Sequence, residues 1–229
     1  MEIKLDIKNM SKQKKASISY IIASFFTQGI NFVTLPIYTR LLSTSDMGII
    51  TTFTSWYSII YAIGTLSLSS GSMSVALIEF KHKRDKYQSV CLTLSTISAL
   101  LFSLMFILFT IKSNSFNISK LGIGLILCLL LIFNPALDSW YLRERYEYKY
   151  KKVLLVSIIT SLFTTFIPIT CVCIAKYYSF ENLGDLRIIS QYGVIIIISI
   201  FFYMHIMKKG KCFFNKKMMK FALNLSIPL

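Results

Sequence analysis

The sequence predicts an all-α fold: a polytopic membrane bundle of six transmembrane helices plus the start of a seventh, with the N-terminus in the cytoplasm. The composition is the first observation, because 55% of the 229 residues are hydrophobic, only 15% are charged and the mean hydropathy is +0.62. Soluble domains hold about 25% charged residues. This chain therefore has too few charges to cover a surface exposed to water.

Six long apolar stretches are the second observation. A hydrocarbon core of about 30 Å is crossed by about 20 helical residues, and none of the stretches carries Lys or Arg in its central part. Lipid offers the backbone no hydrogen bonds, which favours helices, and the sequence lacks the alternating polarity typical of a membrane barrel. The predicted spans are Ala16–Ile37, Gly48–Leu68, Ser89–Ile111, Leu121–Leu142, Val153–Ala175 and Ile188–Met207.

Basic residues alternate between the two sides of the predicted bundle, which is the third observation. The segment before the first span and the connections after the second, fourth and sixth spans hold most of the 25 Lys and Arg residues. The positive-inside rule makes this side cytoplasmic. The net charge of +15 therefore indicates anionic lipid headgroups rather than nucleic acid. The opposite side holds only Arg40, Lys112, Lys120, Lys176 and Arg187.

Four segments follow from this pattern. Residues 1–15 form a cytoplasmic or interfacial N-terminal segment, residues 16–207 the six-helix transmembrane bundle, and residues 208–220 a basic cytoplasmic loop. Residues 221–229 are the truncated start of a seventh transmembrane helix, so we expect either a fragment or a gene that is cut short, and a working protein that is larger. The first apolar run follows a basic segment, as in a signal peptide, but it is too long and lacks a small-residue cleavage site.

Polar residues recur every three to four positions in three predicted spans, so each set shares one helix face. Small hydroxyl residues on such a face are typical of helix packing. Amides favour a hydrated cavity instead, because an amide in lipid needs a partner or water. Gln28 and Asn31 make the first stripe the stronger cavity candidate, and both alternatives stay open. The stripes are Ser24, Thr27, Gln28, Asn31, Thr34 and Tyr38; Thr51, Thr54, Ser55, Ser58, Tyr61 and Thr65; and Ser157, Thr160, Ser161 and Thr164.

Asp138 is the one acidic residue well inside a predicted span. A charge at membrane depth is a functional candidate. The alternative is an interfacial ion pair with Arg143 or Arg145, which follow within two turns of the same helix. Prolines at three further positions can kink their helices for gating, or they are simply structural; these are Pro36, Pro135 and Pro168.

Catalytic and metal-binding motifs are missing from the sequence. The five cysteines show no pair with the spacing of metal ligands. A zinc-protease motif, a glycine-rich phosphate loop and usefully spaced carboxylate pairs are also missing. We therefore expect no cofactor and no metal, and we expect transport rather than enzyme activity.

Three stretches carry a family resemblance. In SYIIASFFTQGINFVTLPIYTRLLSTSDMGIITTFTSW a polar-striped span leads through Pro36, Arg40, a double Leu and Asp46 to Gly48, which opens the second span. WYLRERYEYKYKKVLLVSIITSL is a basic and aromatic connection, and KFALNLSIPL begins another apolar run. Together they resemble the N-terminal half of the polysaccharide (O-antigen type) flippase family, within the multidrug/oligosaccharidyl-lipid/polysaccharide exporter superfamily.

The resemblance implies a bacterial inner-membrane protein of twelve or more spans in two bundles. Such a protein flips undecaprenyl-pyrophosphate-linked oligosaccharide by alternating access, with a cationic cavity for the pyrophosphate. Its partners are the lipid-linked oligosaccharide, membrane lipids and other polysaccharide assembly proteins. This chain has one bundle and no central Arg or Lys, so a cationic lining would come from a missing half or from arginines at the rims. The candidate substrate-binding residues are Gln28, Asn31, Arg40, Asp138, Arg143 and Arg145.

Two other functions compete with the flippase. A drug or cation antiporter of the same superfamily needs buried acids, for which Asp138 alone is a poor candidate. A membrane-embedded polysaccharide polymerase or ligase needs a large outer loop rich in basic residues and His. The outer loops expected here are short: Thr39–Met47, Lys112–Lys120 and Lys176–Arg187.

Overall fold

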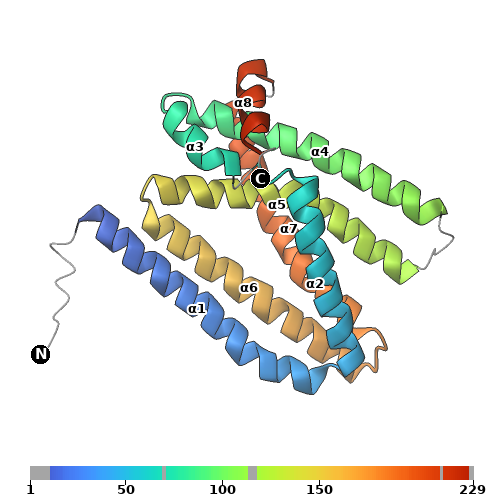
Figure 1. Ribbon diagram of the computed structural model, residues 1–229. Helices are drawn as coiled ribbons and strands as arrows, with labels where there is room; N and C mark the ends of the chain where they lie inside the picture. The colour runs from blue at the N-terminus through green and yellow to red at the C-terminus, as the bar shows by residue number, and fades with distance from the viewer. Residues whose placement is uncertain (1–10, 69–70, 113–117, 212–213, 227–229) are drawn as a thin grey trace, which may run out of the picture.

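The computed structural model describes residues 11–68, 71–112, 118–211 and 214–226, and this part of the chain is helical, without a strand. Figure 1 shows long helices packed side by side, with two short ones at one end. The helices are α1 (Lys12–Leu41), α2 (Thr44–Gly64), α3 (Gly71–Glu79), α4 (Arg84–Lys112), α5 (Ile118–Tyr146), α6 (Tyr150–Tyr177), α7 (Leu183–Gly210) and α8 (Lys216–Ser226).

Five of the described helices are long and apolar enough to cross a membrane. The all-α fold that the sequence predicts is confirmed for the described residues, and the five helices are consistent with a membrane bundle. Each continues through any proline that it contains, so Pro36, Pro135 and Pro168 all lie inside unbroken helices. The qualifying segments are Gln13–Leu41, Arg84–Met105, Gly122–Tyr146, Tyr150–Tyr177 and Leu183–Gly210.

The second predicted span is a helix, but it is not among the five that are long and apolar enough to cross a membrane. Its 21 residues in α2 include many Ser and Thr side chains, which lower its hydropathy. The helix ends at Gly64 rather than at Leu68, because Leu66 and Ser67 adopt positive φ angles of 53° and 46°. The count of six spans plus a seventh, and the cytoplasmic N-terminus, therefore stay predictions.

Helix α7 lies at the centre of the bundle, where it packs against α2, α4, α5 and α6. One large apolar core joins these helices through residues such as Leu130, Ile188 and Tyr192. By contrast, α1 lies at the edge and packs against α6 (Figure 1). The interior helices therefore share a common core, whereas α1 has one main neighbour.

The two ends of the bundle differ in charge. Helices α1, α4 and α6 begin, and α5 and α7 end, at what we call the basic end, where Lys15, Arg84, Arg143, Lys151 and Lys208 lie. At this end α7 meets α4 so closely that a Cβ on Gly210 would overlap the Ser89 side chain and would lie 2.6 Å from the Asp85 carbonyl oxygen. Only a glycine fits this crossing.

The opposite end is joined by hydrogen bonds around the start of α2. The Asp46 carboxylate accepts from the backbone N–H of Ser43 and from that of Gly184 in α7, each over 3.0 Å. Burial raises the pKa of Asp46, but these bonds and one from the Ser43 hydroxyl outweigh it and leave the pKa below its ordinary value. Nearby, Lys176 Nζ donates to the carbonyl oxygens of Arg40 and Leu41, which ties α6 to the end of α1.

The two short helices differ from what the sequence predicts. Helix α3 lies in the predicted loop after the second span, and α8 begins within residues 208–220, the predicted basic loop. Phe221 of α8 packs edge-on against Phe80 at 5.2 Å, so α8 lies against α3. Before it, α7 ends at Gly210, since Lys211 is left-handed (φ 47°).

Parts of all four predicted segments lie outside the described residues, including residues 69–70 and 113–117 of the predicted bundle and residues 212–213 of the predicted basic loop. Residues 1–10 hold most of the predicted N-terminal segment, and residues 227–229 are the last ones of the predicted seventh span. The predictions for these residues are therefore neither confirmed nor corrected.

Candidate functional site

A ladder of polar side chains joins α2 to α5 inside the bundle. Asn134 Nδ2 donates to Tyr57 Oη over 2.9 Å, and Tyr61 Oη donates to Asp138 Oδ2 over 2.5 Å. Both pairs are one helical turn apart on each helix, so successive turns of α2 and α5 are in register. We call these four residues the polar ladder.

Aromatic rings and one hydroxyl from the central helix surround the ladder. Tyr192 of α7 lies 5.6 Å from the Tyr57 ring and 5.0 Å from Phe53. Ser199, which is fully buried in α7, donates to Asn134 Oδ1 over 3.5 Å. The ladder therefore connects three helices, and its polar groups are satisfied within the bundle, as buried polar groups must be.

The structure separates Asp138 from one of the two arginines that the sequence placed beside it. Arg143 Nη1 instead donates to Asp85 Oδ1 over 2.5 Å and to Gln88 Oε1 over 2.9 Å, both in α4. Its Nε donates to Glu147 Oε1 over 3.2 Å. The Arg143 guanidinium is thus occupied by two carboxylates and an amide, and it holds α5 to α4.

Glu147 sits at the centre of the charges at the basic end. It contacts Arg143, Lys149 and, at 3.9 Å, Arg84. Burial raises the pKa of Glu147, but the hydrogen bonds from Lys149 and Arg143 outweigh it and leave the pKa below its ordinary value. We call Arg84, Asp85, Arg143, Glu147 and Lys149 the ion cluster.

Arg145 remains outside the ion cluster. It is exposed, and its guanidinium carbon lies 5.8 Å from the ring of Tyr141 and 5.8 Å from the ring of Tyr20 in α1. Tyr20 Oη also donates to the Arg145 carbonyl oxygen over 3.4 Å. Of the two arginines predicted beside Asp138, Arg145 is therefore the one whose charge is open to a ligand.

The predicted amides of α1 face outward. Gln28 and Asn31 are both exposed, and within the described residues neither side chain has a hydrogen-bond partner. The hydroxyls on either side of them behave differently, because Thr27 donates to the Ser24 carbonyl and Thr34 to the Asn31 carbonyl of the same helix. The hydroxyls of this stripe are satisfied locally, whereas its amides are not.

The stripe of α2 divides into two parts. Tyr61 enters the polar ladder, and Thr65 is fully buried. The earlier hydroxyls are exposed and bond to their own helix backbone, as Thr54 does to the Ile50 carbonyl and Ser58 to the Thr54 carbonyl. Both interpretations of the stripe are therefore represented in one helix: packing near its end and an exposed polar face near its start.

Arg187, a cation of the opposite end that is not among the predicted site residues, has an aromatic partner. The guanidinium carbon of Arg187 lies 3.9 Å from the centre of the Tyr38 ring, which is a strong cation–π geometry. The predicted Arg40 has an exposed side chain instead.

The sequence analysis partly missed the polar ladder. Asn134 and Tyr57 each lie one turn before a residue that the sequence analysis singled out, Asp138 and Tyr61. Because side chains four residues apart share a helix face, that spacing was the available signal.

Within the described residues, no three His, Cys, Asp or Glu side chains gather where they could hold a metal ion. The four cysteines in this part of the chain are free thiols: Cys91, Cys128, Cys171 and Cys173. Comparison with protein-family models, with curated proteins and with solved structures gave no match to this chain.

Proposed function

We propose that this chain belongs to a transporter that flips undecaprenyl-pyrophosphate-linked oligosaccharide repeat units across the bacterial inner membrane. The repeat units would serve the synthesis of a surface polysaccharide such as O-antigen or capsule, and the cycle would be alternating access. In this proposal the basic end is cytoplasmic, and the partners are the lipid-linked oligosaccharide, membrane lipids and other polysaccharide assembly proteins. The resemblance of the segment from Ser19 to Trp56 to a flippase family motivates it.

The observation that carries the proposal is the exposed amide pair on α1. Gln28 and Asn31 lie in the middle of a helix long enough to cross a membrane, and they face away from the bundle. An amide in hydrocarbon without a partner costs about 2 kcal/mol or more. Such a face is stable next to water, sugar hydroxyls or another protein surface, which is what one wall of a polar transport path provides.

Charges at the rims refine the choice of substrate-binding residues. Arg145 and Arg40 are exposed and open to an anionic pyrophosphate. Arg143 is engaged by Asp85 and Glu147, so we assign it to holding helices together. Asp138 is held by Tyr61, and in this proposal it orients α2 rather than binding the sugar.

The test is deletion of the gene in its host, followed by complementation. The deletion should abolish surface polysaccharide and trap lipid-linked repeat units on the cytoplasmic leaflet. We expect the double variant Gln28→Leu/Asn31→Leu to restore transport at least about tenfold less well than the natural sequence, since each lost hydrogen bond is worth about 1 kcal/mol. Val33→Leu, at an exposed apolar position of the same helix, is the matched control and should complement fully.

A drug or cation antiporter is the second candidate, and the carboxylate of Asp138 inside the bundle is the observation that favours it. Normal polysaccharide in the deletion strain, together with raised drug sensitivity that Asp138→Asn fails to rescue, would support the antiporter and overturn the flippase. A polysaccharide polymerase is the weaker alternative. The described connections at the opposite end are short, with α2 beginning three residues after α1 ends at Leu41.

A further inference from the structure

Helices α1 and α6 run side by side in the same direction from the basic end (Figure 1). Tyr20 contacts Arg145 just before α6 begins, and Lys176 bonds to the carbonyls that end α1. Between these two points the helices leave apolar hollows on their surface. Most of the side chains lining them are exposed or half-buried, so the hollows open to the surroundings of the bundle.

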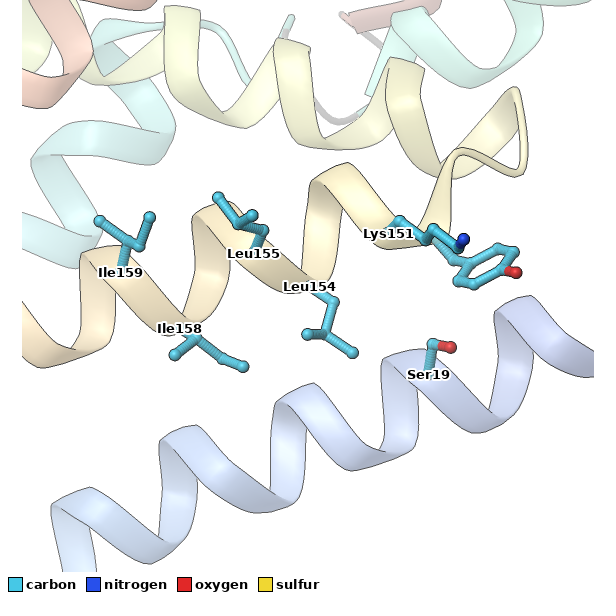
Figure 2. Close-up of a pocket in the computed structure, with 7 residues that line it drawn as sticks. Ser19, Lys151, Leu154, Leu155, Ile158 and Ile159 are labelled. Carbon is cyan, nitrogen blue, oxygen red and sulfur yellow. The ribbon is translucent and has the colours of Figure 1, made fainter.

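The first hollow lies at the basic end and has a volume of about 320 Å³. Figure 2 shows it between the two helices, with polar side chains at one end and aliphatic ones along the rest. The polar end is formed by Ser19 and Lys151, and the aliphatic part by Leu154, Leu155, Ile158 and Ile159. From Lys151 to Ile159 the helix rises about 12 Å, which is most of the thickness of one leaflet of a hydrocarbon core.

The second hollow continues in the same direction. It has a volume of about 450 Å³ and is lined by residues such as Gly29 and Val33 of α1 and Leu162, Phe166 and Ile169 of α6. On α6 these positions continue the spacing of three and four residues that begins in the first hollow, so both hollows lie along one helix face. An extended alkyl chain that enters the first hollow therefore has an apolar surface ahead of it.

The charge at the basic end of the first hollow, which is its entrance, favours one kind of lipid headgroup. Neither α1 nor α6 contains an acidic residue, whereas Lys14, Lys15, Lys151 and Lys152 lie near the start of these helices. Among the described residues, α5 and its following turn carry the carboxylates of Glu144 and Glu147, and both are paired with basic side chains. The entrance is therefore cationic, and an anionic group is favoured next to an apolar chain.

We propose that the first hollow is a binding site for one anionic phospholipid of the membrane. Its phosphate lies against Lys151, beside Ser19, whose hydroxyl donates to the Lys15 carbonyl oxygen. One acyl chain lies along the α6 surface formed by Leu154, Leu155, Ile158 and Ile159, next to α1. This site is separate from the polar face of α1 that carries the amides, and it does not depend on the transported substrate. The bound lipid would fill the space between α6 and α1. The most apolar stretch of α1 is the least buried of the five candidate spans.

Native mass spectrometry of the full chain in detergent tests the site, with phosphatidylglycerol and phosphatidylcholine of identical acyl chains as probes. We expect one phosphatidylglycerol to stay bound under conditions that strip phosphatidylcholine. Lys151→Gln should reduce phosphatidylglycerol occupancy about fivefold, since one cation near an anionic headgroup is worth about 1 kcal/mol. Lys217→Gln, the same charge change on the exposed side of α8, is the matched control and should leave occupancy unchanged.

A second pair of variants tests the alkyl part of the site independently of charge. Ile159→Trp fills the hollow and should reduce the occupancy of phosphatidylglycerol, whereas Ile197→Trp, on an exposed part of α7, should not. Equal retention of both phospholipids, or equal occupancy in Lys151→Gln and Lys217→Gln, would overturn the proposal. Displacement of phosphatidylglycerol by an equal concentration of polyprenyl phosphate would overturn it too, because the hollow would then belong to a carrier lipid.

Discussion

Helices α1 and α4 are both long and apolar, yet their polar residues differ in burial and in hydrogen bonding. Half of the most apolar 18-residue stretch of α4 is buried (50%), against 11% in α1. In α4 the buried Gln88 bonds across to Ser139 and Arg143 of α5, whereas Gln28 of α1 faces outward. The same residue type therefore stabilises the fold in one helix and is free for other chemistry in the other.

The largest effect expected from breaking the interior region is at the crossing of α7 and α4. Gly210→Ala places a methyl group 2.6 Å from the Asp85 carbonyl oxygen and closer still to Ser89, so the two helices must move apart. Overpacking of this kind costs about 1–3 kcal/mol. We expect a clear fall in the midpoint of thermal unfolding in detergent.

Gly193→Ala in the same helix is the control for this substitution. A Cβ at Gly193 meets nothing within 4 Å, and alanine favours a helix over glycine by up to about 1 kcal/mol. This variant should be as stable as the natural chain or more so. Equal losses in both variants would mean that the crossing is loose.

A double-mutant cycle on the polar ladder sharpens the comparison at a smaller scale. Tyr61→Phe and Asp138→Leu each remove one side of the bond between α2 and α5. Coupling energies between polar groups of packed membrane helices average about 0.6 kcal/mol and reach about 1.7 kcal/mol. We expect a value in this range, measured from unfolding free energies.

The matching cycle on the edge helix uses Gln28→Leu and Asn31→Leu. Because neither amide has a partner within the described chain, we expect no coupling between them and no loss of stability from either change. Coupling as large as that of the polar ladder would show that α1 is packed as the interior helices are.

The smallest effect above zero is expected from titration of the ion cluster. A carboxylate whose pKa is lowered by folding stabilises the protein above its ordinary pKa of 4.5 and loses that contribution as the pH falls through the lowered value. Glu147 should therefore contribute less than about 1 kcal/mol near neutral pH and nothing in strong acid. The unfolding free energy measured between pH 7 and pH 3 should fall less steeply in Glu147→Gln than in the natural chain. An unchanged dependence on pH would show that Glu147 does not contribute to this loss of stability.

The sequence predicts the five long apolar helices because hydropathy depends only on residues that are neighbours in the sequence and not on tertiary contacts. It does not predict α3, nor where α8 begins, because these helices are short and are held by contacts with each other, such as Phe221 against Phe80. Helices this short are rarely stable alone. Their existence depends on partners that the sequence does not identify.

The sequence predicts which kinds of polar residue the candidate site contains, but it does not predict which residues they contact. A carboxylate in a span and amides on one stripe are visible in the sequence. That Asp138 meets Tyr61 depends on how α5 packs against α2, because Tyr61 comes from a different helix. Arg143 shows the same limit, because its partner Asp85 comes from a different helix.

The central place of α7 has a consequence for biosynthesis. Helix α2 finds its main protein neighbour in α7, which leaves the ribosome long after α2 does. Until then α2, with its many hydroxyl side chains, must wait in the translocation machinery or in lipid with Tyr57 and Tyr61 only partly enclosed. The bundle therefore completes its interior only after α7 has been synthesised, and a nascent chain arrested before Leu183 should remain open to proteases that a chain containing α7 resists.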